Sequence, residues 1–237
     1  MSRIGQIASI VRYPVKSMAG EILRHSVLTE WGLAGDRLYA FESSGAPSGM
    51  LRVTGRERRE MLRYEPILLP DGTVDVRTPT GESFRVDSEA LLAYLQSHIP
   101  GVSSLSLTQA AIPQTDVRPL SLISLQTVQQ LSDELGARLD PRRFRANLHL
   151  DLTDGPFTED SLVGRTARIG NTATIKILER DPRCRLITYD PEMPHSSPPL
   201  FSVMKLLDRR HEGRAGVYAS ILASGPVQID DPIEVLD

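Results

Sequence analysis

The chain has 237 residues, of which 40% are hydrophobic and 24% charged, so it is long enough for one large or two closely packed domains and is not disordered as a whole. A formal net charge of −3 gives no electrostatic reason to expect a nucleic acid or an anionic membrane as a partner. The single cysteine excludes an internal disulfide and a protein-held iron–sulfur cluster, and the lack of a signal peptide or a spanning apolar run predicts a cytoplasmic protein.

The first part of the chain contains short alternating runs separated by turn residues. They predict strands at residues 7–13, 24–28 and 38–41. The clearest hairpin joins residues 73–77 to 83–86 through Pro79-Thr80-Gly81. A helix follows, capped by Asp87 or Ser88 and ended by Pro100-Gly101.

Residues 103–119 are polar and poorly periodic, which predicts a connection between two units with a boundary after residue 112. Ser124 then caps a helix whose apolar face ends before Gly136. Residues 190–199 hold four prolines, and we expect a loop there that borders the functional cleft. Strands are predicted at residues 148–152, 166–169, 174–178, 186–189, 217–222 and 227–235.

Strands dominate this pattern, and strands do not alternate with helices as they do in a parallel sheet. The sequence therefore predicts a mainly β fold of barrel-like antiparallel sheets with a few helices.

The usual nucleotide-binding glycine motifs and metal-binding histidine spacings are missing, but Cys184 has an unusual setting. Arg180, Arg183 and Arg185 flank it, directly before a predicted strand. Nearby cations favour a thiolate, which is a nucleophile and a ligand for soft metals. The alternative is a free cysteine packed as a small apolar residue.

Three other segments place a cation and a small polar group at a strand end. They are Pro14-Val15-Lys16-Ser17, Gly32-Leu33-Ala34-Gly35-Asp36-Arg37 and Phe144-Arg145-Ala146-Asn147. Each alone is compatible with a capped turn or a surface charge. Together with Arg183-Cys184 they suit an anionic ligand that carries a phosphate and a thiolate-seeking metal.

At these residues the sequence resembles the MOSC proteins, in particular the branch with the mitochondrial amidoxime-reducing component and its N-terminal β-barrel domain. The resemblance runs along nearly the whole chain. Its motifs are Tyr13-Pro14-Val15-Lys16-Ser17, Gly32-Leu33 with Gly35-Asp36-Arg37, Leu122-Ile123-Ser124, Arg143-Phe144-Arg145 with Asn147, Arg183-Cys184 with Leu186, Thr188 and Asp190-Pro191, and Asp231-Pro232-Ile233.

The resemblance implies an N-terminal barrel-like domain over residues 1–112 and a MOSC β-barrel domain over residues 113–237. It implies the molybdenum cofactor, a phosphate-bearing pterin, between them; pyridoxal phosphate is not expected. Cys184 matches the catalytic cysteine that ligates molybdenum. The residues that match the cofactor-binding positions are Lys16, Ser17, Arg37, Arg145, Asn147, Arg183 and Tyr218. Pro182 departs from the serine that often precedes the Arg-Cys pair, and it supplies neither an N–H nor a hydroxyl for the cofactor contact expected at that position.

The expected function is the molybdenum-dependent reduction of N-hydroxylated or other N-oxygenated small molecules. We expect the electrons to come from a separate protein, such as a reductase or a ferredoxin-like or cytochrome b5-like carrier, because the chain has no such domain and no membrane anchor. Two alternatives stay open. Cys184 could carry a persulfide to an acceptor, or the protein could store or deliver the cofactor without turnover.

Overall fold

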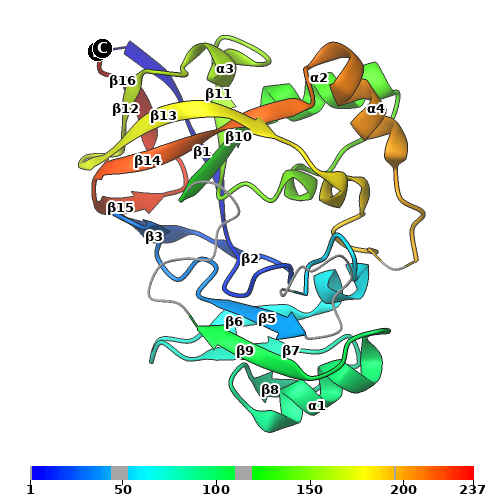
Figure 1. Cartoon of the computed structure of the whole chain (residues 1–237). Helices are drawn as coiled ribbons and strands as arrows, with labels where there is room; N and C mark the ends of the chain where they lie inside the picture. The colour runs from blue at the N-terminus through cyan, green and yellow to red at the C-terminus, as the bar shows by residue number, and fades with distance from the viewer. Residues whose placement is uncertain (1, 44–52, 110–118, 195) are drawn as a thin grey trace.

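The computed structural model describes residues 2–43, 53–109, 119–194 and 196–237. The predicted domain boundary after residue 112 lies outside these residues. The described residues form a barrel and a smaller unit of sheets and one helix, drawn in the upper and lower parts of Figure 1.

Seven strands close the barrel, because β11 pairs with β1 at the two ends of the strand order. Only β10 and β11 run parallel; the other neighbours in the described barrel are antiparallel. In order around the barrel, the strands are β11 (Leu148–Leu152), β10 (Leu120–Ser124), β14 (Arg214–Ala223), β13 (Ala173–Pro182), β12 (Thr166–Ile169), β16 (Pro232–Val235) and β1 (Ser2–Arg12). The short strand β2 (Glu21–Leu23) pairs with the end of β1 and lies outside this ring of seven strands.

Alternating side chains fill the barrel, as Leu148, Leu150 and Leu152 of β11 show. The same core takes in Ile7 and Ile10 of β1, so both ends of the chain build one core. A small sheet beside the barrel closes this core. Its strands are β15 (Gly225–Gln228), β3 (His25–Thr29) and β4 (Gly32–Leu33).

The smaller unit has its own core, drawn from residues between Val15 and Leu105. Helix α1 (Glu89–His98) contributes Leu91 and Leu95, and the Ser88 side chain caps it by accepting a hydrogen bond from the Leu91 N–H at 3.2 Å. The other elements are β5 (Tyr39–Ser43) with β9 (Leu105–Gln109), β6 (Glu65–Leu68) with β7 (Val74–Arg77) and β8 (Ser83–Arg85), and the 3-10 helix η2 (Arg59–Arg63).

A third core lies between helices outside the barrel (Figure 1). Helix α2 begins with the Ser124 hydroxyl accepting a hydrogen bond from the Thr127 N–H, and it ends at Gly136 in the left-handed conformation. Around this core lie α2 (Leu125–Leu135), α4 (Phe201–Arg210) and the 3-10 helices η3 (Pro141–Phe144) and η4 (Arg185–Thr188); α3 (Thr158–Ser161) lies between β11 and β12 in the chain. Within the described ranges, every helix is too short or too polar to cross a membrane.

The expected mainly β fold, the hairpin of β7 and β8, and helices α1 and α2 are confirmed. The prediction of a strand at residues 186–189 is wrong, because the chain there forms η4. The polar stretch after residue 103 is also more than a connection, since β9 pairs with β5 along its length. Helix α4 is missing from the prediction because prolines precede it and Leu200 supplies no side-chain cap.

His149 of β11 makes the fold sensitive to acid. It is 3% exposed, and its Nδ1 lies 2.6 Å from the Ser9 hydroxyl. Burial lowers the pKa of His149 to about 4. The unfolded chain therefore binds a proton more readily, near pH 6.5, and stability falls as the pH drops from 6.5 towards 4.

Between pH 7 and pH 5, we expect the free energy of unfolding to fall by about 2 kcal/mol more in the wild type than in the His149→Asn variant. Asparagine can still face Ser9 but does not titrate in this range. Urea unfolding at both pH values measures the difference. Equal losses in the two proteins would show that His149 is not the titrating group.

Candidate functional site

One cavity of about 230 Å³ gathers every site residue expected from the sequence. Its lining includes Lys16, Ser17, Arg37, Arg145, Asn147, Arg183, Cys184 and Tyr218. These residues stand on turns and strand ends far apart in the sequence, and the fold brings them together. We call this space the cysteine cavity.

Arg37 and Arg145 both lie against the ring of Tyr13. Their guanidinium carbons lie 4.9 and 4.2 Å from the ring centroid. Arg37 also donates a hydrogen bond to the Arg145 carbonyl at 3.2 Å and forms an ion pair with buried Asp36. The π face and the carboxylate offset the repulsion between the two cations. The result is a fixed pair of positive charges at the cavity.

Three site residues have left-handed backbone although none is glycine. The φ angles are 69° at Ser17, 48° at Arg37 and 52° at Arg145. Such a conformation costs roughly 1–2 kcal/mol for a residue with a Cβ. Backbone hydrogen bonds hold it, including Arg37 N–H to the Tyr13 carbonyl at 2.6 Å. The turns that supply the cations are thus among the strained parts of the described backbone, which also include Ser104, Phe157, Glu212 and Asp230.

Arg183 stands at the centre of a buried polar network. Its Nε donates to the Ala215 carbonyl and its Nη1 to the Phe144 carbonyl, both at 2.7 Å. It also forms an ion pair with Asp181 at 2.9 Å. These contacts join β13 to β14 and η3, so Arg183 stabilises the fold at the cavity wall.

Asp181 connects this network to Tyr218. It accepts hydrogen bonds from the Ser121 hydroxyl at 2.9 Å and from the Tyr218 hydroxyl. Burial raises the pKa of Asp181, and burial together with the Asp181 charge raises that of Tyr218. Tyr218 therefore keeps its proton and remains a hydrogen-bond donor. Sequence reasoning missed Ser121 and Asp181, which also line the cavity.

Asn147 is fully buried and links two strands. Its Oδ1 accepts from the Ser121 N–H and its Nδ2 donates to the Val11 carbonyl, each at 3.3 Å. It therefore ties β1 to β10 beside the cavity. Its expected role in cofactor binding stays a prediction.

Lys16 and Ser17 lie on a tightly anchored turn after β1. Val15 and Met18 on either side of them are fully buried in the core of the smaller unit. The Lys16 N–H donates to the Tyr39 carbonyl at 2.8 Å. The ammonium group is thus brought to the cavity by the smaller unit, whereas Cys184 comes from the barrel side.

Cys184 is half-buried and caps the first turn of η4. Its carbonyl accepts from the Ile187 N–H at 3.2 Å, and its side chain makes no capping hydrogen bond. In the described ranges, no three His, Cys, Asp or Glu side chains cluster as a metal site. Any metal here would thus need ligands from a bound molecule in addition to the thiol.

The arginines next to Cys184 in sequence are engaged with other partners. Arg180 pairs with Asp160, Arg183 with Asp181, and Arg185 donates to the Tyr189 hydroxyl. The expectation that these flanking arginines serve the thiolate therefore has no support in their contacts. Besides Arg183, cations from distant segments share the cavity with Cys184, namely Lys16, Arg37 and Arg145.

Thr54 and Arg56 line the cysteine cavity and were not predicted. Thr54 is 6% exposed, and its hydroxyl has no hydrogen-bond partner among the described residues. A buried hydroxyl without a partner is costly, which is typical of a group that awaits a ligand. The segment has no apolar periodicity, so the sequence offered no signal for it.

A second cavity of about 620 Å³, which we call the larger cavity, adjoins the first and shares Arg143, Arg145 and Leu186 with it. Pro191, Glu192 and Pro194 line it, so the proline-rich loop borders the larger cavity; that it borders the functional cleft stays a prediction.

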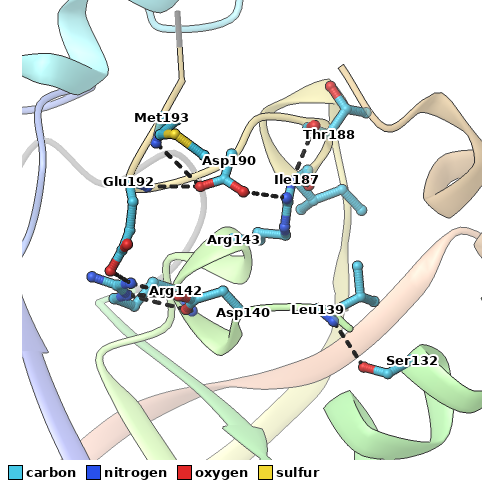
Figure 2. A network of polar contacts seen from close by, with 10 residues as sticks. All are labelled: Ser132, Leu139, Asp140, Arg142, Arg143, Ile187, Thr188, Asp190, Glu192 and Met193. Carbon is cyan, nitrogen blue, oxygen red and sulfur yellow. Dashed lines mark hydrogen bonds and ion pairs between the residues drawn. The ribbon is translucent and has the colours of Figure 1, made fainter. Parts of the chain in front are cut away.

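Two arginines of η3 hold this loop in place, as Figure 2 shows. Arg142 bridges Asp140 and Glu192, the latter at 2.7 Å. Arg143 donates to the Thr188 carbonyl at 3.1 Å and pairs with Asp190 at 3.0 Å. The start of the loop is therefore fixed relative to η3 and η4.

Two family models match the chain. The MOSC domain matches residues 109–234, and the MOSC N-terminal beta barrel domain matches residues 4–136. No curated protein matches.

Solved structures with a similar fold include the YuaD protein from Bacillus subtilis, at 13% identity and a TM-score of 0.54, over 98% of this chain and 94% of that one. YiiM from Escherichia coli has 16% identity and a TM-score of 0.44, over 95% of this chain and 70% of that one. The likeness to YuaD shows a common fold.

Proposed function

Because the chain belongs to the MOSC domain family and also carries the MOSC N-terminal beta barrel domain, we propose that it binds the molybdenum cofactor in the cysteine cavity and reduces N-hydroxylated compounds. The observation that carries this proposal is the lining of that cavity, which combines one thiol with six cationic side chains, among them Lys16, Arg37 and Arg145 from three separate segments.

The residues present suit the chemistry of the cofactor. Lys16, Arg37 and Arg145 supply positive charge for a phosphate, and the guanidinium forks can bind its oxygens in pairs. The unpartnered hydroxyl of Thr54 adds a further polar contact. Cys184 supplies the soft sulfur ligand that molybdenum would take.

When bound, the cofactor supplies two-electron redox chemistry at its metal. In the overall reaction, R–NHOH, two electrons and two protons give R–NH₂ and water, with cleavage of the N–O bond. A separate electron-donor protein supplies the electrons in this proposal. Tyr218, kept protonated, donates its hydroxyl proton to Asp181, so its Oη offers a hydrogen-bond acceptor within the same cavity.

The first experiment is metal analysis and pterin fluorescence on protein made in a host that synthesises the cofactor, followed by turnover of an N-hydroxyamidine with an artificial electron donor. Stoichiometric molybdenum with turnover supports the proposal. Molybdenum without turnover would favour cofactor storage or delivery. A persulfide on Cys184 without molybdenum would favour sulfur transfer.

Arg145→Ala is expected to lower cofactor occupancy at least about tenfold, because each charge-assisted contact contributes ~1.5–3 kcal/mol. The stability of the cofactor-free protein should fall by only about 0.5–1 kcal/mol, from the lost contact with Tyr13. Molybdenum content and thermal unfolding measure the two effects. Arg168→Ala, on β12 and outside both cavity linings, is the control and should keep its molybdenum. Full occupancy in Arg145→Ala would contradict the assignment.

A further inference from the structure

The segment that leads into η2 is basic, although the protein as a whole is acidic. Residues 53–63 have a formal charge of +2, because they contain two glutamates and the four arginines Arg56, Arg58, Arg59 and Arg63, whereas the whole chain has a net charge of −3. The buried side chains of η2 are its two apolar residues, which anchor it to the fold. Of the arginines, Arg63 is exposed and Arg59 partly exposed.

Two of these arginines can meet a partner without breaking a contact in the fold. Arg58 is held in place, because it donates hydrogen bonds to the carbonyls of Glu57 and Gly101. The side chains of Arg59 and Arg63 form no hydrogen bond and no ion pair with any residue that the structure describes. Their positive charge is therefore directed to the solvent, where it attracts negative charge.

The basic segment packs against the turn of chain that follows Cys184. A Cβ placed on Gly55 would lie 3.1 Å from Cδ2 of Leu186, which stands in η4 two residues after Cys184. Leu186 lines both cavities, whereas Arg56 lines the cysteine cavity and Arg63 the larger one. A molecule bound to the basic segment would thus lie beside the turn that holds the thiol.

Exposed side chains around the larger cavity extend this surface. Arg185 of η4 is exposed and donates to the hydroxyl of Tyr189, which lines the larger cavity. Ile67 is 46% exposed and lines it as well, and Met193, at 55%, lies between two residues that line it. Interfaces between proteins combine such apolar contacts with polar and charged ones. We call Arg59, Arg63 and Arg185 the basic face.

The charges at this opening favour an acidic partner protein. Glu192 is paired with Arg142, and Glu65 lies opposite Arg77 in the pairing of β6 with β7, so the charge of the basic face remains. A nucleic acid or an anionic membrane would also meet the rest of a chain whose net charge is −3, which repels it. A small protein with an acidic patch needs to meet only the basic face.

We propose that the basic face binds the acidic patch of a one-electron carrier protein, which delivers electrons beside Cys184. This inference rests on the proposed function, which requires a separate electron donor. Two reduced carriers give one electron each and are oxidised. With two protons, R–NHOH then yields R–NH₂ and water as its N–O bond breaks.

The double variant Arg59→Glu and Arg63→Glu tests the basic face, with an acidic plant-type [2Fe–2S] ferredoxin as the probe. In the cofactor-loaded protein at low ionic strength, kcat/KM for the reduced ferredoxin should fall at least about tenfold. At about 0.5 M salt the difference from the wild type should shrink to about twofold, because the Debye length is then only about 4 Å. Molybdenum content and turnover with reduced methyl viologen, which needs no docking surface, should stay within about twofold.

A second double variant, Arg3→Glu and Arg138→Glu, is the matched control. Both arginines are exposed and lie outside both cavity linings, and Arg3 stands near the start of β1, whereas Arg12 is its last residue. The control changes the net charge of the protein by the same amount but should keep kcat/KM for the ferredoxin within about twofold. An equal loss in the control and in Arg59→Glu with Arg63→Glu would overturn the inference, because net charge alone would then explain the effect.

Calorimetric binding of the ferredoxin separates this inference from the proposed function. If methyl viologen drives no turnover in the wild type, the proposed function fails, yet ferredoxin binding that weakens in Arg59→Glu with Arg63→Glu still supports the basic face. If methyl viologen drives turnover but the ferredoxin does not bind, or binds the variant as tightly as the wild type, the inference alone fails. A wild-type dimer that these substitutions turn into a monomer would assign the face to a second copy of the chain and overturn it as well.

Discussion

Cys184→Ala is expected to abolish the reduction of N-hydroxylated compounds, with a loss of more than about a thousandfold in turnover, while the protein keeps its fold. The expected loss is large because Cys184 is the residue that the proposal places on the metal. The fold should survive because the half-buried thiol belongs to none of the three hydrophobic cores and makes no capping hydrogen bond. Steady-state turnover and thermal unfolding of the same preparations measure both effects.

Cys184→Ser is the matched variant, since it keeps the size of the side chain and replaces sulfur with oxygen. It should also lose most activity, because a hydroxyl is a poorer ligand for a soft metal. Turnover at the wild-type rate in Cys184→Ala would contradict metal ligation by this residue. The part of the proposal that would then remain is the binding of the cofactor by the cations of the cysteine cavity.

Arg183→Met is expected to lower the free energy of unfolding by about 3–5 kcal/mol, because it removes one partner of a buried ion pair and leaves the other charge uncompensated. Arg183 and Asp181 are both buried, and two backbone carbonyls lose their donors as well. Urea unfolding of the cofactor-free protein measures the change. In Arg145→Ala, by contrast, we expect cofactor occupancy to fall and the free energy of unfolding to change little.

A second substitution checks the cause of this destabilisation. Asp181→Asn removes the charge and keeps one acceptor oxygen for the hydroxyls of Ser121 and Tyr218. The double variant should be less destabilised than the sum of the two single variants, because the uncompensated carboxylate is gone. A loss below about 1 kcal/mol in Arg183→Met would contradict the structural role of the pair.

The sequence motifs predicted the cations and the thiol of the site better than the buried residues that support them. Lys16 and Arg37 stand next to small polar residues that mark turns, and Arg145 lies two residues before Asn147; turns of this kind can be predicted from sequence. Thr54 and Asp181 come to line the cysteine cavity only when the chain folds, so their neighbours in the sequence do not reveal this role. Arg183 donates to backbone carbonyls of β14 and η3, and no pattern in the sequence predicts these contacts.

The errors in secondary structure have a similar origin. Residues 186–189 have the β-branched and aromatic composition of a strand, but Arg143 binds the carbonyls of Ile187 and Thr188, and the chain closes a 3-10 turn instead. Strand β6 contains Pro66, which argues against a strand on local grounds, yet it pairs with β7. In each case tertiary contacts outweigh local preference.

X-ray absorption at the molybdenum edge tests the central claim most directly, because it reports the sulfur neighbours of the metal in the cofactor-loaded protein. The comparison is between the wild type and Cys184→Ser, with Arg168→Ala as a control. We expect Cys184→Ser to have one sulfur neighbour fewer than the wild type and Arg168→Ala to match the wild type. The same sulfur shell in Cys184→Ser and in the wild type would contradict ligation of molybdenum by Cys184.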